Sequence, residues 1–166
     1  MTDREKIISL LDQYPDAAST IRQRIMADLG EAIVVGELQK RGIGCKLCSG
    51  GKRKAVDIVL DDGRTVQVKT SRNDHRIVTR YFQNTKHADF WVLLLVTEPP
   101  RFFVLTRDKI RKLQYKRNHP KMSLEEYEKK PRKGVDNLLV SSVLKFEERW
   151  DTFNGHRMGT GTKGRS

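Results

Sequence analysis

The sequence contains little cysteine, few aromatic residues and no long apolar run. Its two cysteines, Cys45 and Cys48, exclude a framework of several disulfide bonds and cannot alone supply the four ligands of a structural zinc ion. A zinc site would need further ligands, with His75 and His87 as the nearest candidates; reduced thiols without a metal are the simpler expectation. The longest apolar run, 90–96, is far shorter than the roughly 18 residues of a transmembrane helix. We therefore expect no membrane-spanning segment.

Charge of one sign predominates. Lys and Arg together number 33 against 21 Asp and Glu, which gives a formal net charge of +12. Such an excess favours a polyanionic partner, and nucleic acid is the commonest polyanion in a cytoplasm. Residues 1–6 alternate in charge and contain no apolar signal segment, so the sequence predicts a cytoplasmic protein.

The chain is predicted to fold as one domain. Its 166 residues, 37% of them hydrophobic, suffice for one core but not for two. We expect this domain over 1–154, with an N-terminal helical part over 1–29 and a core over 30–113. Residues 155–166 are rich in Gly, Thr, Arg and Lys and are expected to form a flexible basic tail.

Helical periodicity dominates the first quarter of the sequence. Apolar spacing predicts a helix over 4–13 and a second helix that begins near Asp16. Gly30 is expected to interrupt or bend the helical pattern, and the next helical piece is expected to stop at Gly42. A further helix is expected over 108–113.

Segments rich in β-branched residues follow. The segments at 55–60 and 65–71 are short and separated by turn residues, which predicts a hairpin. Residues 76–82 alternate weakly, and the apolar run at 90–96 predicts a strand buried on both faces, followed by another strand at 101–105. This order of elements predicts an α/β fold, in which a central mixed, mostly antiparallel sheet is flanked by helices.

The register of the hairpin depends on its loop. A two-residue loop would place Asp57 opposite Val68. A three-residue loop over 61–63, with Gly63 in the left-handed conformation, places Asp57 opposite Gln67 instead. We predict the three-residue loop.

One carboxylate lies on the apolar face of a predicted helix. On a helical wheel Glu31 falls within about 60° of Val34, Val35 and Leu38. A lone buried carboxylate needs a cation, hydrogen-bond donors or a metal ion to offset its desolvation. Two interpretations stay open: a functional acid, or an acid that is favoured near a helix start or paired with an Arg at the edge of the core.

Polar residues also interrupt the hairpin strands. Gln67 and Lys69 project from one face of their strand, and the predicted register adds Asp57 to them. The helix that carries Glu31 is expected to cover this same face. Two acids with a nearby lysine suit phosphodiester hydrolysis with a divalent cation, for which Mg²⁺ is the natural ion and Mn²⁺ a substitute. The alternative is a half-buried structural ion pair between Asp57 and Lys69.

These residues resemble the PD-(D/E)xK nucleases, the restriction-endonuclease-like superfamily. The resemblance rests on Glu31 in GEAIVVGELQKRG, Asp57 in AVDIVL and Gln67-Val68-Lys69 in TVQVKTS, and it spans about 30–113. Small single-domain members, such as intron-type homing endonucleases and Holliday-junction resolvases, are nearest in pattern. The resemblance implies a restriction-endonuclease-like core.

The resemblance also implies the roles of four residues. Glu31, Asp57 and Gln67 would bind Mg²⁺, and Lys69 would act on the attacking water, so that all four are catalytic. The chain departs from the family pattern at two positions. Val56 stands where the motif often has Pro, and Gln67 stands where it has Asp or Glu, which removes one negative charge from the metal site.

Basic residues flank the two strands of the hairpin. Phosphate contacts of such residues position a DNA duplex without reading its sequence. The alternative is a solvated basic loop with no partner. The predicted DNA-binding residues are Lys52, Arg53 and Lys54 before the first strand and Arg72, His75 and Arg76 after the second.

The sequence thus predicts a Mg²⁺-dependent endonuclease that cleaves double-stranded or branched DNA. With one site per chain, cutting both strands of a duplex requires a homodimer or sequential nicking, and we expect a homodimer. A second hypothesis is a catalytically inactive nuclease-like protein that binds nucleic acid. A third is an interaction protein that masks an acidic surface of another protein.

Overall fold

The computed structural model describes five segments of the chain and two single residues. Of the helix expected over 4–13, Glu5 and Ser9 are described, and both are helical. The basic segment at 52–54 and the tail expected over 155–166 lie outside the described residues, and the single domain over 1–154 stays a prediction. The described residues are 19–48, 56–72, 74–80, 88–118 and 135–154, with Glu5 and Ser9.

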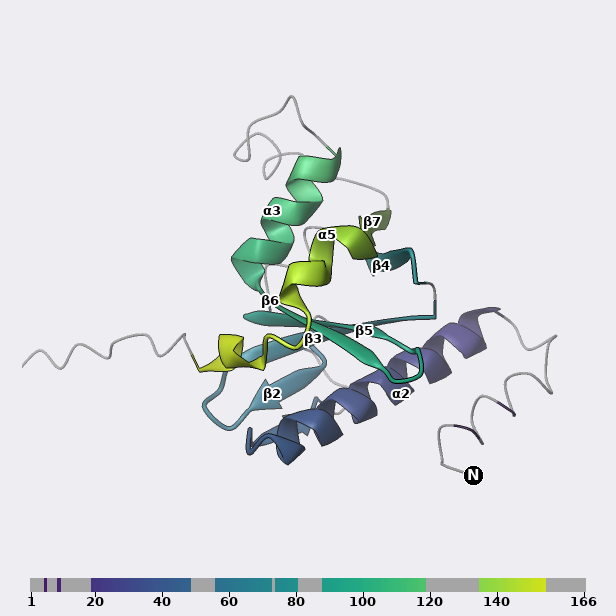
Figure 1. Ribbon diagram of the computed structural model, residues 1–166. Helices are drawn as coiled ribbons and strands as arrows, with labels where there is room; N and C mark the ends of the chain where they lie inside the picture. Colours follow the sequence, from purple (N-terminus) through teal and green to yellow (C-terminus); the bar gives the residue numbers. More distant parts are fainter. Residues whose placement is uncertain are drawn as a thin grey trace, which may run out of the picture.

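A five-stranded mixed sheet forms the centre of the fold (Figure 1). Its order is β1-β2-β3-β5-β6, in which β3 and β5 run parallel and the other neighbours run antiparallel. This confirms the predicted α/β fold with a mixed, mostly antiparallel sheet; the restriction-endonuclease-like assignment stays a prediction. The strands are β1 Cys45–Leu47, β2 Ile58–Leu60, β3 Thr65–Ser71, β5 Phe90–Leu95 and β6 Arg101–Thr106.

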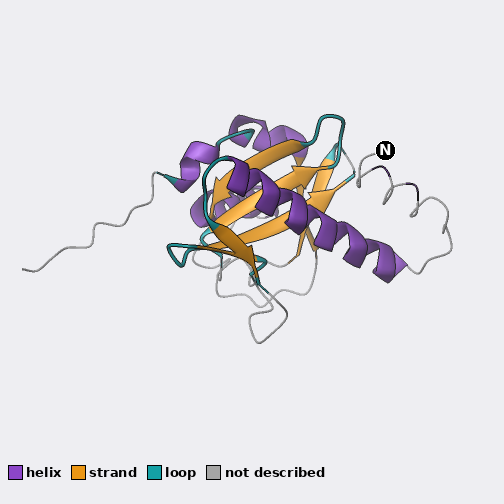
Figure 2. Cartoon of the chain, turned by 90° about the horizontal axis from the view of Figure 1, so that it is seen from below, coloured by secondary structure: helices purple, strands orange, loops and turns teal. Residues whose placement is uncertain are grey.

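Helices cover both faces of this sheet. Helix α2, Ser19–Lys40, runs across one face (Figure 2). The opposite face carries α3 and α5 together with a small sheet of β4 and β7 (Figure 1). Among the described residues, no helix is long and apolar enough to cross a membrane. The elements of the second layer are α3 Arg107–Asn118, α5 Val140–Val143, β4 Arg76–Arg80 and β7 Val135–Leu139, and the 3-10 helices Leu144–Phe146 and Trp150–Phe153 complete the fold.

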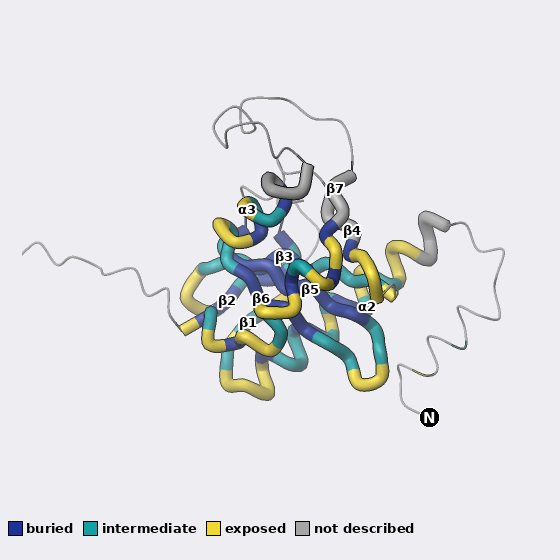
Figure 3. Tube along the Cα trace, turned by 45° about the horizontal axis from the view of Figure 1, so that its top comes forward, coloured by how far each residue is buried: buried dark blue, intermediate teal, exposed yellow. Residues whose placement is uncertain are grey.

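Strand β5 separates the two hydrophobic cores. All of its side chains are buried, and Figure 3 shows the dark-blue centre of the sheet around it. Phe90, Val92 and Leu94 belong to the core beneath α2, whereas Trp91 and Leu93 belong to the core on the α3 side. The prediction of a strand buried on both faces is therefore confirmed.

Helix α2 is continuous through Gly30, so the predicted interruption is wrong. Gly30 serves close packing instead, because a Cβ atom there would lie 2.9 Å from the Thr70 Cβ atom on β3. The predicted stop at Gly42 is confirmed. Gly42 has φ of 73°, and the N–H of Ile43 bonds to the Leu38 carbonyl (3.0 Å), as in helices that end on a left-handed glycine.

The hairpin has the predicted three-residue loop. The backbone N–H of Leu60 donates to the Arg64 carbonyl (2.8 Å), and the N–H of Gly63 donates to the Leu60 carbonyl (2.9 Å). Gly63 has φ of 84°, the left-handed conformation that glycine tolerates. The register pairs Ile58 with Val66, which brings Asp57 beside Gln67.

The remaining elements are partly predicted. Strand β4 agrees with the expected strand at 76–82. Helix α3 contains the expected helix at 108–113, begins one residue earlier at Arg107 and runs on to Asn118. Strands β1 and β7 were not predicted. The first has only three residues and lies at the sheet edge, and the second, VDNLL, owes its pairing to β4, a partner distant in the chain.

Candidate active site

Asp57 lies directly before β2 and closes the ladder between β2 and β3. Its backbone N–H donates to the Val66 carbonyl (3.1 Å). Its Oδ2 atom accepts hydrogen bonds from the Val68 backbone N–H (2.7 Å) and from the side-chain amide of Gln67. Because β2 begins only at Ile58, the carboxylate satisfies a β3 N–H that would otherwise lack a strand partner. The predicted approach of Asp57 and Gln67 is confirmed.

Lys69 projects from the same face of β3 as Gln67. Parallel pairing places Gln67 beside Trp91 and Lys69 beside Leu93, both in the core on the α3 side. The Lys69 ammonium nitrogen lies 5.9 Å from the centre of the Trp91 ring. Such a cation–π contact restricts where the amine lies. Gln67 is buried, with 6% of its surface exposed.

Helix α2 does not cover this face, so that part of the prediction is wrong. It packs on Val66 and Val68, which alternate with Gln67 and Lys69 along β3 and project from the opposite face. The apolar stripe of α2 requires an apolar partner, and within β3 only the valine face offers one. Glu31, on α2, therefore lies on the opposite side of the sheet from Gln67 and Lys69.

The two faces meet at an open edge of β3. Strand β5 pairs with β3 along its length from Val66 to Ser71, whereas β2 pairs with β3 at Thr65 and Val66. From Gln67 onward, this edge has no strand partner among the described residues. Asp57 lies at the edge itself and is partly buried. Groups from opposite faces of the sheet thus approach a single carboxylate.

Glu31 is half-buried and senses the charges at this edge. Burial, followed by the negative charges of Asp57 and Asp28, raises the pKa of the Glu31 carboxyl to about 7, while Lys69 opposes the shift. Among the described residues, Glu31 has no hydrogen-bond or ion-pair partner that would offset its burial. The predicted desolvation of Glu31 agrees with this partial burial. A desolvated acid beside a second acid is typical of metal and catalytic sites.

The pKa of the Asp57 carboxyl is also raised by burial. This pKa lies above the usual value, although Lys69, the Val68 N–H and the Gln67 amide all lower it. Two acids therefore share one region, and the local cation and donors do not fully compensate their burial. A further positive charge placed between them would favour the ionised form of both.

The donor set fits a hard divalent cation such as Mg²⁺. Such ions prefer carboxylate and amide oxygens, and Glu31, Asp57 and Gln67 supply both kinds. Oδ2 of Asp57 is used by two donors, while its second oxygen has no hydrogen bond to the described residues. Gln67 donates its amide nitrogen to Asp57, which leaves the amide oxygen as its ligand atom. No group of three or more His, Cys, Asp or Glu side chains occurs in the described segments, so a metal site here depends on the amide.

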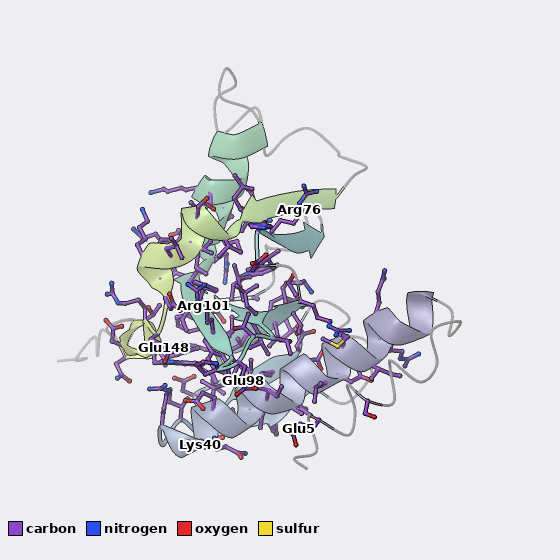
Figure 4. The ribbon with its side chains drawn as sticks, turned by 45° about the vertical axis from the view of Figure 1, so that its right-hand side comes forward. Glu5, Lys40, Arg76, Glu98, Arg101 and Glu148 are labelled. Carbon is purple, nitrogen blue, oxygen red and sulfur yellow. The ribbon has the colours of Figure 1, made fainter. Side chains whose placement is uncertain are left out.

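Three of the predicted DNA-binding residues lie next to this edge. Arg72, His75 and Arg76 are exposed in the turn between β3 and β4, and the Ser71 hydroxyl donates to the Arg76 carbonyl (3.0 Å), which fixes the turn. Figure 4 shows Arg76 at the start of β4, on the side of the sheet away from α2. His75 pairs with Asp74 (3.3 Å). The predicted residues Lys52, Arg53 and Lys54 lie outside the described residues.

Trp91 and the Val68 backbone belong to this site but were not predicted. Trp91 appears in the sequence as one member of the apolar run at 90–96, and nothing there singles it out from the core. Its position beneath Lys69 follows from the parallel pairing of β3 with β5, which connects distant parts of the chain. Backbone donors leave no signal in a sequence. Cys45 and Cys48 form no disulfide bond in the described part of the chain.

Comparisons with known proteins give structural likenesses but no sequence match. No family model and no curated protein matches the sequence. The fold is similar to that of a bacterial homing endonuclease of known structure, with 24% sequence identity, a TM-score of 0.42 and coverage of 51% of this chain. The chain spans 65% of that protein's length. The function proposed below rests on the geometry of the site.

Proposed function

We propose that the protein is a Mg²⁺-dependent DNA endonuclease that hydrolyses phosphodiester bonds. The convergence of Asp57, Gln67 and Lys69 at the open edge of β3, with Glu31 approaching from α2, is the observation that carries this proposal. When bound, Mg²⁺ (or Mn²⁺ in its place) supplies charge stabilisation at the scissile phosphate and a lower pKa for a coordinated water.

The residues of the chain divide this work among them. Asp57 and Glu31 supply anionic oxygens for the cation, and Gln67 supplies a neutral one while its nitrogen fixes the Asp57 carboxylate. Lys69, held over the Trp91 ring, orients the attacking water or the phosphate that it attacks. A bound cation would favour the ionised form of both acids, whose pKa values partial burial raises.

DNA would lie along the exposed basic turn beside this edge. Arg72, His75 and Arg76 contact phosphates there and position the duplex without reading its sequence. Cleavage of both strands by one site per chain requires a homodimer or two sequential nicks. We place this activity in the cytoplasm, on double-stranded or branched DNA.

Metal removal tests the proposal at its simplest. The wild-type protein should nick supercoiled plasmid with Mg²⁺ or Mn²⁺ and leave it intact in EDTA. Without the cation, the two acids cannot stabilise charge at the phosphate or lower the pKa of a water. Gel electrophoresis of the plasmid forms measures this. Cleavage in EDTA, or none with either ion, would contradict the proposal.

A second function is supported by one observation. Gln67 is neutral and hydrogen-bonds to Asp57, so the site has one negative charge fewer than three carboxylates would give it. The protein would then be a nuclease-like module that binds nucleic acid without cutting it. Its binding would be independent of metal and would weaken steeply with salt.

The variant Gln67→Glu separates the two functions. A third carboxylate beside two desolvated acids should tighten Mn²⁺ binding by at least about tenfold, since ligand charge sets affinity, and should destabilise the metal-free protein. Titration calorimetry measures the affinity. Wild-type cleavage supports the nuclease, whereas Mn²⁺ binding gained only by the variant supports the inactive module. Gln39→Glu, an exposed position on the same helix as Glu31, serves as the control and should change neither property.

A further inference from the structure

Helix α2 and strand β3 approach unusually closely at one point. A Cβ atom on Gly30 would lie 2.9 Å from the Cβ atom of Thr70 and 3.1 Å from its Cγ2 atom, and would overlap its hydroxyl. Gly36, less than two turns later in the same helix, has nothing within 4 Å of the corresponding position. Only the first of these glycines is therefore required by packing.

The contact is steric. Gly30 is buried, and the Thr70 hydroxyl is buried with no hydrogen-bond partner among the described residues. Rotation of the Thr70 side chain cannot relieve the clash with an added Cβ atom at position 30. The Thr70 Cβ atom is fixed by the strand backbone, and β-branched side chains have few rotamers. A larger residue at position 30 would push the helix away from the strand.

The two contacting residues are direct neighbours of the site. Gly30 precedes Glu31, and Thr70 follows Lys69. The depth at which α2 rests on β3 at this point therefore sets how close Glu31 comes to Asp57 and Lys69, whose charges it senses. Catalytic and metal-binding groups tolerate displacements of only about 0.5 Å.

We propose that Gly30 and Thr70 are positioning residues, whose close contact holds Glu31 at the distance from Asp57 at which the two acids bind one divalent cation. This inference rests on the proposed function. It gives Gly30 a role in the site, whereas the sequence alone suggested that Gly30 would interrupt or bend the helix.

The test compares Mn²⁺ affinity among four variants of the full chain. Gly30→Ala should bind Mn²⁺ at least about tenfold more weakly than the wild type, because the helix must move outward. Gly30→Ala combined with Thr70→Gly removes the obstructing side chain and should restore affinity to within about threefold of the wild type. Gly36→Ala, with open space around it, should leave affinity unchanged. Titration calorimetry with MnCl₂ measures affinity, and circular dichroism confirms the fold.

A fourth variant separates positioning from general loss of stability. Val104→Ala removes packing from the core beneath α2 on β6, away from the site, and should lower the melting temperature without a matching loss of Mn²⁺ affinity. If Gly30→Ala binds Mn²⁺ as tightly as the wild type, or if the double variant restores nothing, the positioning role is wrong while the proposed function stands. If the wild type itself binds no Mn²⁺, the proposed function fails and this inference fails with it.

Discussion

Replacement of Asp57 by Asn is expected to reduce plasmid cleavage by about 10²–10⁴-fold while preserving the fold. The carbonyl oxygen of Asn can still accept the hydrogen bonds from the Val68 N–H and the Gln67 amide, so the end of the β2–β3 ladder stays closed. The negative charge is lost, and with it a ligand of the cation. Lys69→Met keeps an apolar side chain over Trp91 but removes the amine, and a loss of the same order is expected.

Controls for this experiment are exposed residues outside the candidate site. Asp108→Asn on α3 and Lys145→Met near β6 change the same charges at exposed positions and should leave cleavage within about twofold of the wild type. Rates from a nicking time course and melting temperatures should be collected for all four variants. Cleavage that survives both Asp57→Asn and Lys69→Met would place the active site elsewhere.

Glu31→Gln is expected to stabilise the metal-free protein above neutral pH and to weaken Mn²⁺ binding at least about tenfold. The pKa of Glu31 is raised to about 7 by burial and by Asp57, so the folded state binds its proton more tightly than the unfolded chain does. Stability therefore falls as pH rises from the unfolded value of 4.5 toward 7, and the neutral amide removes this loss. Solvent screening of a half-exposed group limits the gain at pH 8 to about 1 kcal/mol, roughly 2–4 °C in melting temperature.

The pH dependence distinguishes this effect from ordinary changes in packing. At pH 4 the wild type and Glu31→Gln should melt at similar temperatures, and the difference should grow up to pH 8. Glu37→Gln on the same helix is the matched control, because Glu37 pairs with Arg41 (2.8 Å) and Lys40 (3.8 Å) and its loss should not stabilise the protein. A Glu31→Gln protein that is less stable than the wild type at pH 8, or that binds Mn²⁺ equally well, contradicts the role assigned to Glu31.

Local patterns in the sequence predicted the hairpin and the central strand. The turn residues at 61–63 determine a three-residue loop, and that loop alone sets which side chain lies beside Asp57. The apolar run of β5 is equally local, because a strand buried on both faces needs apolar residues at every position. These features depend on residues close together in the chain.

Features that depend on distant contacts were mispredicted or missed. Gly30 was expected to interrupt or bend the helical pattern. Its close contact with Thr70, 40 residues away in the chain, could not be seen from the local sequence. The prediction of which sheet face α2 covers was wrong for a related reason. A helical wheel identifies the apolar stripe of a helix, but it does not show which strand face that stripe packs against. The open edge of β3, which lets Glu31 approach Asp57 from the opposite face, follows from where β2 begins and β5 continues.

The central claim is that Asp57 and Glu31 share one divalent cation at this edge. Crystals soaked in MnCl₂ and measured near the manganese absorption edge test it directly, since anomalous scattering locates the ion without assumptions about its ligands. We predict one strong peak in contact with carboxylate oxygens of both residues. The absence of such a peak, or a peak that contacts neither Asp57 nor Glu31, would contradict the account.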